Sequence, residues 1–176
     1  MKKHFTLLFA LLITCSFSAC NLTTGSSESS EATVLTDFID TNNVIDMKSF
    51  GNWEITIHSA EAKKEIVKDS RASYNAKEKY KFVVIGATVK NVGNDEDTFL
   101  PTTLSNSIVK IVYNENEYLS TRLAVSSLDL KLTTLKPSDS KTGIIVFEVP
   151  EDIADSYEDF ELVFTYNDDI CSFLLK

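Results

Sequence analysis

Apolar and polar residues alternate with a period of two through most of the chain after residue 50. In residues 53–58, Trp53, Ile55 and Ile57 are separated by polar residues, which is typical of a strand with one buried face. The same alternation restarts after each turn. It predicts seven or eight strands, drawn from residues 53–58, 80–92, 108–113, 118–121, 128–132, 142–149, 160–166 and 170–175.

Residues 80–92 differ from the other predicted strands because both of their faces are apolar. Val83 and Ile85 lie on one face, and Phe82 lies on the other. A strand that is apolar on both sides is expected at the centre of a sheet, with its two faces covered. Gly86, halfway along it, predicts a β-bulge or a close approach.

Turn-forming segments separate these strands. Residues 93–95, 114–117 and 136–139 are rich in Gly, Asn, Asp or Pro, and we expect 114–117 to be a four-residue hairpin connection. The acidic residues 151–159 have room for one helical turn, and residues 63–68 fit a helix or a strand edge equally well. With no convincing amphipathic helix, the pattern predicts an all-β protein, an antiparallel β-sandwich.

The first twenty residues follow another pattern. Residues 1–4 are basic, and residues 5–19 carry no charge and are mostly apolar. This is the layout of a secretory signal. A helix needs about 20 apolar residues to span a hydrocarbon core of ~30 Å, so an uncleaved anchor helix is the lesser alternative.

The end of this signal, Phe17-Ser18-Ala19-Cys20, resembles the lipobox of bacterial lipoproteins. In that family the cysteine thiol receives a diacylglycerol, and cleavage leaves the modified cysteine as the first residue. The resemblance implies cleavage between Ala19 and Cys20 and attachment of palmitate-like acyl chains at Cys20, which would hold the protein on the outer side of a cell membrane. The alternative is an ordinary signal cut after Ala19, which would leave a soluble protein.

The remainder divides into a tether and a domain. Residues 21–31 are rich in Ser and Thr with one large apolar residue, and such a segment cannot offset its chain entropy by burial. Residues 32–50 are intermediate in composition between the tether and the domain, and residues 34–39 could form either a short helix or a first strand. We therefore expect a signal peptide at 1–19, a lipidated cysteine and tether at 20–50, and one folded domain at 51–176.

Several stretches resemble a widespread, functionally uncharacterised group of bacterial lipoproteins. Residues 78–93, EKYKFVVIGATVKNVG, are similar to its first signature strand. Residues 135–137 and then 141–150, KTGIIVFEVP, are similar to the second, and the closing strand around 162–164 also fits. The group has an immunoglobulin-like, telokin-like domain related to secreted immunoprotective antigens. The resemblance covers 51–176 and implies an immunoglobulin-like fold, but it implies no activity.

The charge of the chain bears on its partners. The formal net charge is −9, and without residues 1–19 it becomes −11, from 15 basic and 26 acidic residues. Such a molecule repels phosphate backbones, so we expect no nucleic-acid partner. A basic partner, or basic components of the envelope, would suit it better.

One cysteine remains once Cys15 leaves with the signal and Cys20 carries lipid. Cys171 then has no partner for an internal disulfide. A small buried apolar side chain is its default role, and the neighbouring Asp168 and Asp169 would raise the pKa of its thiol.

No catalytic constellation stands out in the sequence. His58 is the only histidine outside the signal, and the alternation places it on the polar side of a strand, at the surface. Phosphate loops, nucleophile elbows and zinc-spaced ligands are lacking, so we expect no cofactor and no enzyme activity. The acidic turns provide the oxygen ligands that calcium takes, and the candidates are Asp95, Asp97, Asp168 and Asp169, outside any EF-hand pattern.

Three functions are compatible with these features. The first, which we favour, is a non-enzymatic binding or interaction module held at the membrane, because a tethered sandwich presents loops and edge strands to partners. The second is an accessory structural lipoprotein of an envelope complex. The third is a carboxylate-dependent hydrolase. A pocket of converging acids would favour the hydrolase, and an exposed apolar patch would favour a binding module.

Overall fold

The computed structural model describes residues 38–69, 72–101, 107–121, 123, 127–166 and 169–176. These residues form twelve strands and two short helical segments. The strands are β1 (Asp46–Phe50), β2 (Trp53–Lys63), β3 (Glu65–Asp69), β4 (Ala72–Asn75), β5 (Tyr80–Asn91), β6 (Asp97–Phe99), β7 (Ser107–Tyr113), β8 (Asn116–Thr121), β9 (Thr133–Leu135), β10 (Ser140–Pro150), β11 (Glu161–Tyr166) and β12 (Asp169–Leu174). The helical segments are α1 (Glu151–Ala154) and the 3-10 turn η1 (Tyr157–Asp159). The expected all-β class is confirmed.

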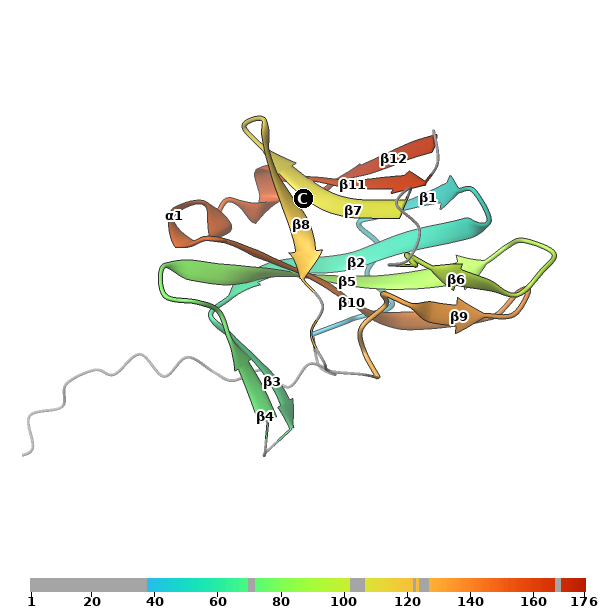
Figure 1. Cartoon of the computed structure of the whole chain (residues 1–176), viewed down its shortest axis with the longest axis horizontal. Coiled ribbons are helices and arrows are strands. Elements are labelled where there is room, and N and C mark those ends of the chain that lie inside the picture. Colours follow the sequence, from blue (N-terminus) through green and yellow to red (C-terminus); the bar gives the residue numbers. More distant parts are fainter. Residues whose placement is uncertain (1–37, 70–71, 102–106, 122, 124–126, 167–168) are drawn as a thin grey trace, which may run out of the picture. The chain divides into compact units, whose positions relative to one another are not determined.

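The main strands form two antiparallel layers, β1-β2-β5-β10 and β8-β7-β11-β12 (Figure 1). In chain order, β2, β5, β7, β8, β10, β11 and β12 correspond to strands A, B, C, C′, E, F and G of an immunoglobulin domain. The layers then read A-B-E and C′-C-F-G, which is the immunoglobulin arrangement. The expected immunoglobulin-like sandwich is therefore confirmed. The pairs β3–β4 and β6–β9 are additional two-stranded ribbons.

Strand β8 belongs to both layers. Its first four residues pair with β7, and its last two, Ser120 and Thr121, pair with Phe147 and Val146 of β10. A continuous path of hydrogen-bonded strands therefore runs from β1 to β12. This crossing strand closes one side of the sandwich.

The inward positions of the two layers meet in one hydrophobic core. The ring of Phe164 in β11 is at its centre, with centroid distances of 6.2 Å to Phe50, 6.0 Å to Phe99 and 5.9 Å to Phe173. Strand β5 contributes alternate residues to this core. The residues of this core that have no exposed surface include Ile55, Ile57, Val83, Ile85, Ala87, Val89, Ile111, Phe147, Val149, Phe160 and Leu162.

The outer face of β5 and β10 is covered as well. Phe82 and Val84 of β5 and Val146 of β10 pack against Ile66 of β3 in a second hydrophobic cluster. In Figure 1 the β3–β4 ribbon lies on the opposite side of β5 and β10 from β7, β11 and β12. The central, doubly covered position expected for residues 80–92 is confirmed by the pairing of β5 with both β2 and β10.

A β-bulge interrupts the pairing of β2 with β5. Ile57 pairs with Ala87 and Ser59 with Gly86, so His58 is the extra residue. A Cβ on Gly86 would lie 2.4 Å from the Ser59 Oγ. Gly86 therefore marks both a bulge and a close approach, as expected.

The hairpin between β7 and β8 is tighter than the sequence indicated. Strand β8 begins at Asn116, so the connection has two residues where four were expected. Those residues, Asn114 and Glu115, have φ angles of 47° and 67°. Positive φ at both central positions is the mark of a type I′ turn, whose twist matches that of the flanking strands.

The strand expected at residues 128–132 is wrong. Leu128 accepts a 2.7 Å hydrogen bond from the Ile144 amide, and the Leu130 amide donates one of 3.1 Å to the Ile144 carbonyl. The segment thus touches β10 in a single parallel bridge. Leu132 then adopts a φ of 62°, which ends any extended run, and β9 starts at Thr133.

Other connections agree with the pattern. Residues 136–139 form a turn, closed by a 3.0 Å hydrogen bond from the Asp139 amide to the Lys136 carbonyl, with Ser138 at a φ of 69°. Residues 151–159 contain the short helices α1 and η1. For residues 63–68 the strand alternative holds, as β3.

The folded domain begins earlier than the expected residue 51. Strand β1 pairs along its whole length with β2, and the Ile45 amide donates to the Ile57 carbonyl at 2.8 Å. Phe38 and Ile39 pack on the second hydrophobic cluster. Residues 38–50, assigned to the tether on sequence grounds, are therefore part of the domain.

Candidate functional site

His58 is buried, with 4% of its surface exposed, which corrects its expected place at the surface. Its side chain lies on the outer side of β2, as does its partner Thr88, and the chain at Asn43 covers it there. Ile57 is buried in the main core on the opposite side, so both neighbours are buried. Its Nδ1 lies 2.6 Å from the Asn43 carbonyl oxygen and its Nε2 lies 2.8 Å from the Thr88 Oγ1. Since a carbonyl can only accept, Nδ1 is the donor in this hydrogen bond.

The His58 contacts continue into a polar chain that spans three strands. The Thr88 Oγ1 lies 2.8 Å from the Thr142 Oγ1 on β10, and the Asn43 side-chain amide donates back to the His58 carbonyl at 2.8 Å. Both ring nitrogens are occupied by these partners. The arrangement suits a clamp between residue 43 and the sheet, because a buried polar network of this kind rigidifies what it joins.

Cys171 lies in the main core with 8% of its surface exposed, in agreement with the small buried apolar side chain expected from the sequence. Burial raises the pKa of its thiol, the nearby Lys48 ammonium lowers it, and the Asp46 carboxylate raises it further, with a net rise. The rise expected from the sequence holds in direction. Its main cause is burial, and Asp46 is the carboxylate that contributes.

The acidic turns do not converge on a metal site within the described residues. The Asp97 Oδ1 accepts the Thr98 amide at 2.7 Å, and Asp95 takes part through its backbone carbonyl, which accepts from Asn91 at 2.8 Å. In the described ranges there is no group of three His, Cys, Asp or Glu side chains placed to hold a metal ion. Asp169 starts β12, and Asp168 lies outside the described residues.

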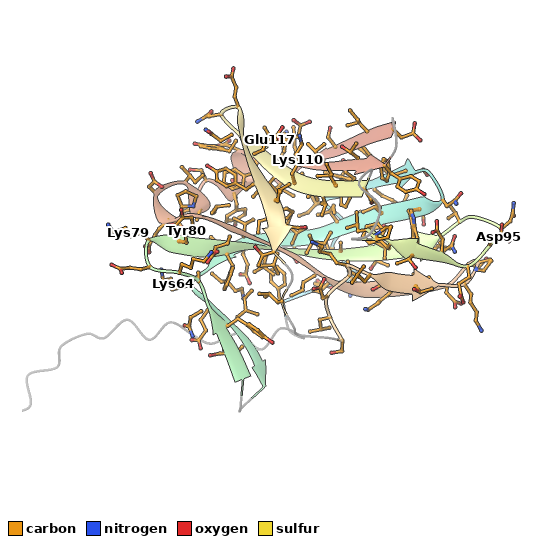
Figure 2. The ribbon with its side chains drawn as sticks, viewed as in Figure 1. Lys64, Lys79, Tyr80, Asp95, Lys110 and Glu117 are labelled. Atoms are coloured by element: carbon orange, nitrogen blue, oxygen red, sulfur yellow. The ribbon has the colours of Figure 1, made fainter. Side chains whose placement is uncertain are left out.

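A solvent-open hollow lies where β5 begins and β10 ends. It has a volume of about 910 Å³, open solvent included, and is lined by Lys79, Tyr80, Pro150, Glu151 and Asp152. Figure 2 shows Lys64, Lys79 and Tyr80 together at this end of the sheet, with Asp95 at the other end. Basic and acidic side chains are mixed around the hollow, and the Lys64 Nζ lies 3.9 Å from a Glu151 carboxylate oxygen.

A second ion pair joins Lys77 to Glu148 of β10. The Lys77 Nζ lies 2.6 Å from the Glu148 Oε2, and the Lys77 amide donates to Oε1 at 2.9 Å. Burial by itself would raise the pKa of Glu148, but the two hydrogen bonds and the charge from Lys77 outweigh it and hold that pKa below its ordinary value. The hydrogen bond to Glu148 raises the pKa of Lys77. With its pKa lowered in this way, Glu148 is a poor general acid.

The most distinctive surface is the outward side of the layer β8-β7-β11-β12, here called the apolar face. Across the strands, Leu119 lies opposite Lys110, and Ile108 lies level with Thr165 and Ile170. Four large aliphatic side chains are exposed on this layer: Ile108 (42%), Leu119 (65%), Ile170 (71%) and Leu174 (52%). They make up half of the large exposed hydrophobic residues among those described.

The polar members of the apolar face include one engaged ion pair. The Lys110 ammonium contacts the Glu117 carboxylate, and the two side chains lie together at the β7–β8 hairpin (Figure 2). A signal for this face was present in the sequence but not used. Residues 162–164 and 170–174 are apolar on both alternating faces, which a strand with one solvated side does not require.

The predicted lipid site lies outside the described residues, as do Ala19 and the signal segment. Within the part of the chain that the structure describes, no helix has the length and apolar character to cross a bilayer.

The sequence matches the model of one protein family, described as a domain of unknown function (DUF4352), over residues 42–171. That range starts before β1 and ends within β12, so it spans the sandwich. A comparison with curated proteins finds no match.

Solved structures of bacterial proteins share the fold. An uncharacterized β-sandwich protein from Clostridium difficile 630 is 17% identical with a TM-score of 0.53, over 76% of this chain and 91% of its own. A conserved hypothetical protein from Bacillus anthracis is 18% identical with a TM-score of 0.54, over 76% and 94%. A protein of Bacillus subtilis proposed to be a lipoprotein is 15% identical with a TM-score of 0.48, over 72% and 37%. At these identities, the first two comparisons bear on the fold alone.

Proposed function

The chain belongs to the family of the domain of unknown function DUF4352, and from that premise we propose that it is a lipoprotein whose β-sandwich acts outside the cytoplasm as a non-enzymatic binding module. The observation that carries the proposal is the Phe17-Ser18-Ala19-Cys20 segment at the end of an uncharged apolar leader. Acyl chains contribute about 0.8 kcal/mol per buried methylene, so two or three of them at Cys20 anchor a protein stably.

The tether fits this placement. Phe38 already packs in the domain, and the sequence between Cys20 and that residue includes the Ser- and Thr-rich residues 21–31. We propose that this stretch is a tether that lets the sandwich reach partners at a distance from the bilayer surface.

A binding role is supported by what the domain presents to solvent. The apolar face offers exposed aliphatic side chains of the kind that mark interaction surfaces. The one histidine outside the signal, His58, is buried and engaged at both nitrogens, so it is a poor general base. We also propose that the relation to secreted immunoprotective antigens extends to this chain, on the strength of residues 78–93 and 141–150.

Lipid attachment at Cys20 is tested by metabolic labelling with a fatty-acid analogue. Wild type and Cys15→Ala, the matched control within the leader, should be labelled and should fractionate with membranes. Cys20→Ala should be unlabelled. Equal labelling of Cys20→Ala and wild type would refute attachment at this residue.

The binding role is tested in intact cells that carry a photo-crosslinking amino acid in place of single residues. A substitution at Leu119, on the apolar face, should give a discrete cross-linked product. Val92, which is 47% exposed and lies outside this face, is the matched control position and should give none. If neither Leu119 nor other positions on the sandwich surface yield a discrete product, the binding role is refuted.

A further inference from the structure

The sandwich covers one of its outer faces and leaves the other bare. Ile66 of β3, with Leu123 and the partly buried Phe38 and Leu128, closes the outer side of β5 and β10 in the second hydrophobic cluster. No described element packs on the apolar face, although it carries aliphatic side chains in several neighbouring strands. An apolar sheet face is normally buried against another element, and here that element would have to come from outside the described chain.

The charges on the apolar face indicate what kind of partner could cover it. On the apolar face, the positive charge of Lys110 is already paired with Glu117. Glu161, in register with Val112 and Leu174, is exposed and has no ion-pair partner among the described residues. With a net charge of −9 for the chain, this surface disfavours a second copy of itself and an anionic bilayer, and it favours a partner with basic residues beside its apolar ones.

The dimensions of the face suit one helix. Four strands at a spacing of about 4.8 Å give a width of ~14 Å, and an α-helix with its side chains is about 10–12 Å across. Leu119 on β8 and Ile170 on β12 lie at the two ends of that width.

We propose that the apolar face of β8-β7-β11-β12 docks a basic amphipathic helix of a partner protein, with Leu119, Ile108 and Ile170 packing against its aliphatic stripe and Glu161 pairing with a Lys or Arg beside that stripe. This inference deepens the proposed function and rests on it. It assigns the binding role to one surface and one chemical class of partner.

The test uses the purified full chain and a fluorescent 18-residue peptide of Leu and Lys in helical spacing, with binding followed by anisotropy at physiological salt. Two double variants are compared: Leu119→Ser with Ile170→Ser on the apolar face, and Val44→Ser with Val92→Ser at exposed positions elsewhere. All four positions are exposed, so both variants should fold, and circular dichroism checks this. A Leu/Glu peptide of the same pattern controls for charge.

The proposal predicts that wild type and the Val44/Val92 variant bind the Leu/Lys peptide equally. The Leu119/Ile170 variant should bind at least tenfold more weakly, because two large apolar contacts are lost. Glu161→Lys should weaken binding at least threefold, and the Leu/Glu peptide should not bind.

Three results would overturn the proposal. They are equal binding by the Leu119/Ile170 variant and wild type, wild-type dimerisation that the same variant abolishes, and binding of wild type to anionic vesicles that depends on Leu119 and Ile170. None of these depends on whether Cys20 carries lipid. A failed docking test therefore leaves the labelling test intact, and the reverse also holds.

Discussion

At the residue scale, Gly86 of β5 and Ser59 of β2 pack closely against each other. A Cβ on Gly86 would lie 2.4 Å from the Ser59 Oγ and 3.0 Å from the Ile39 Cγ1. The Ser59 hydroxyl is buried and, within the described chain, has no hydrogen-bond partner. The bulge at His58 brings the two strands together at this point, and the absence of a side chain at residue 86 permits it.

This contact gives a prediction that couples the two residues. Gly86→Ala should lower the free energy of unfolding by about 1–3 kcal/mol through overpacking. Ser59→Ala should be neutral or slightly stabilising, because it removes an unsatisfied buried hydroxyl. Adding it to Gly86→Ala should restore part of the loss, as measured by urea unfolding in a double-mutant cycle. Strictly additive effects would contradict the packing described.

Cys171 gives a second residue-scale prediction, one that depends on pH. Its pKa is raised above the ordinary value of 9.0, mainly by burial, so its stabilising effect is complete below the unfolded-state pKa and is lost as the pH rises through the folded-state pKa. The free energy of unfolding should therefore fall at alkaline pH, and Cys171→Ala should flatten that fall. Alkylation at pH 8 should be slow in the folded protein and fast in denaturant. Rapid alkylation of the folded protein would show that the thiol is accessible.

At the element scale, the segment 128–130 shows why alternation alone was misleading. Its leucines pack beside β10, and a Cβ on Gly143 would lie only 2.1 Å from the Leu128 carbonyl oxygen. One glycine in a neighbouring strand thus allows a parallel bridge where the pattern indicated a strand. The alternation indicates which side chains are apolar, but it does not indicate whether their backbone forms the hydrogen bonds of a β-sheet.

The polar chain around His58 also acts at the scale of elements, because it holds the start of the domain against β2 and β5. His58→Leu should lower the free energy of unfolding by about 1–3 kcal/mol, since the Asn43 carbonyl loses its donor. Hydrogen exchange at the Ile45 amide, which donates to Ile57, should accelerate more than exchange in β11. Thr56→Ala, on the outward side of the same strand, is the control and should leave Ile45 unchanged. Unaltered exchange at Ile45 in His58→Leu would contradict the role of a clamp.

At the scale of the whole molecule, the sequence predicted the fold class and the central strands well. Both β5 and β10 are apolar on two faces, so each must be covered on both sides whichever elements cover them. It misplaced the start of the domain, since β1 (Asp46–Phe50) has two charged residues and one aromatic anchor, Phe50, and reads as a linker without its partner β2. It also placed His58 at the surface, because the segment around Asn43, which covers this histidine, reads as a linker in the sequence. The apolar face needed the sheet order to bring β8 beside β7 and β11 beside β12.

The account at this scale depends on a molecule divided between a removed leader and a lipid-held sandwich. Mass spectrometry of the N-terminal peptide of the protein purified from membranes tests this most directly. We predict a peptide that begins at Cys20 and carries the mass of a diacylglyceryl group, with residues 1–19 absent. A peptide that begins at Met1, or an unmodified Cys20 at the start of a protein recovered from the medium, would contradict the account.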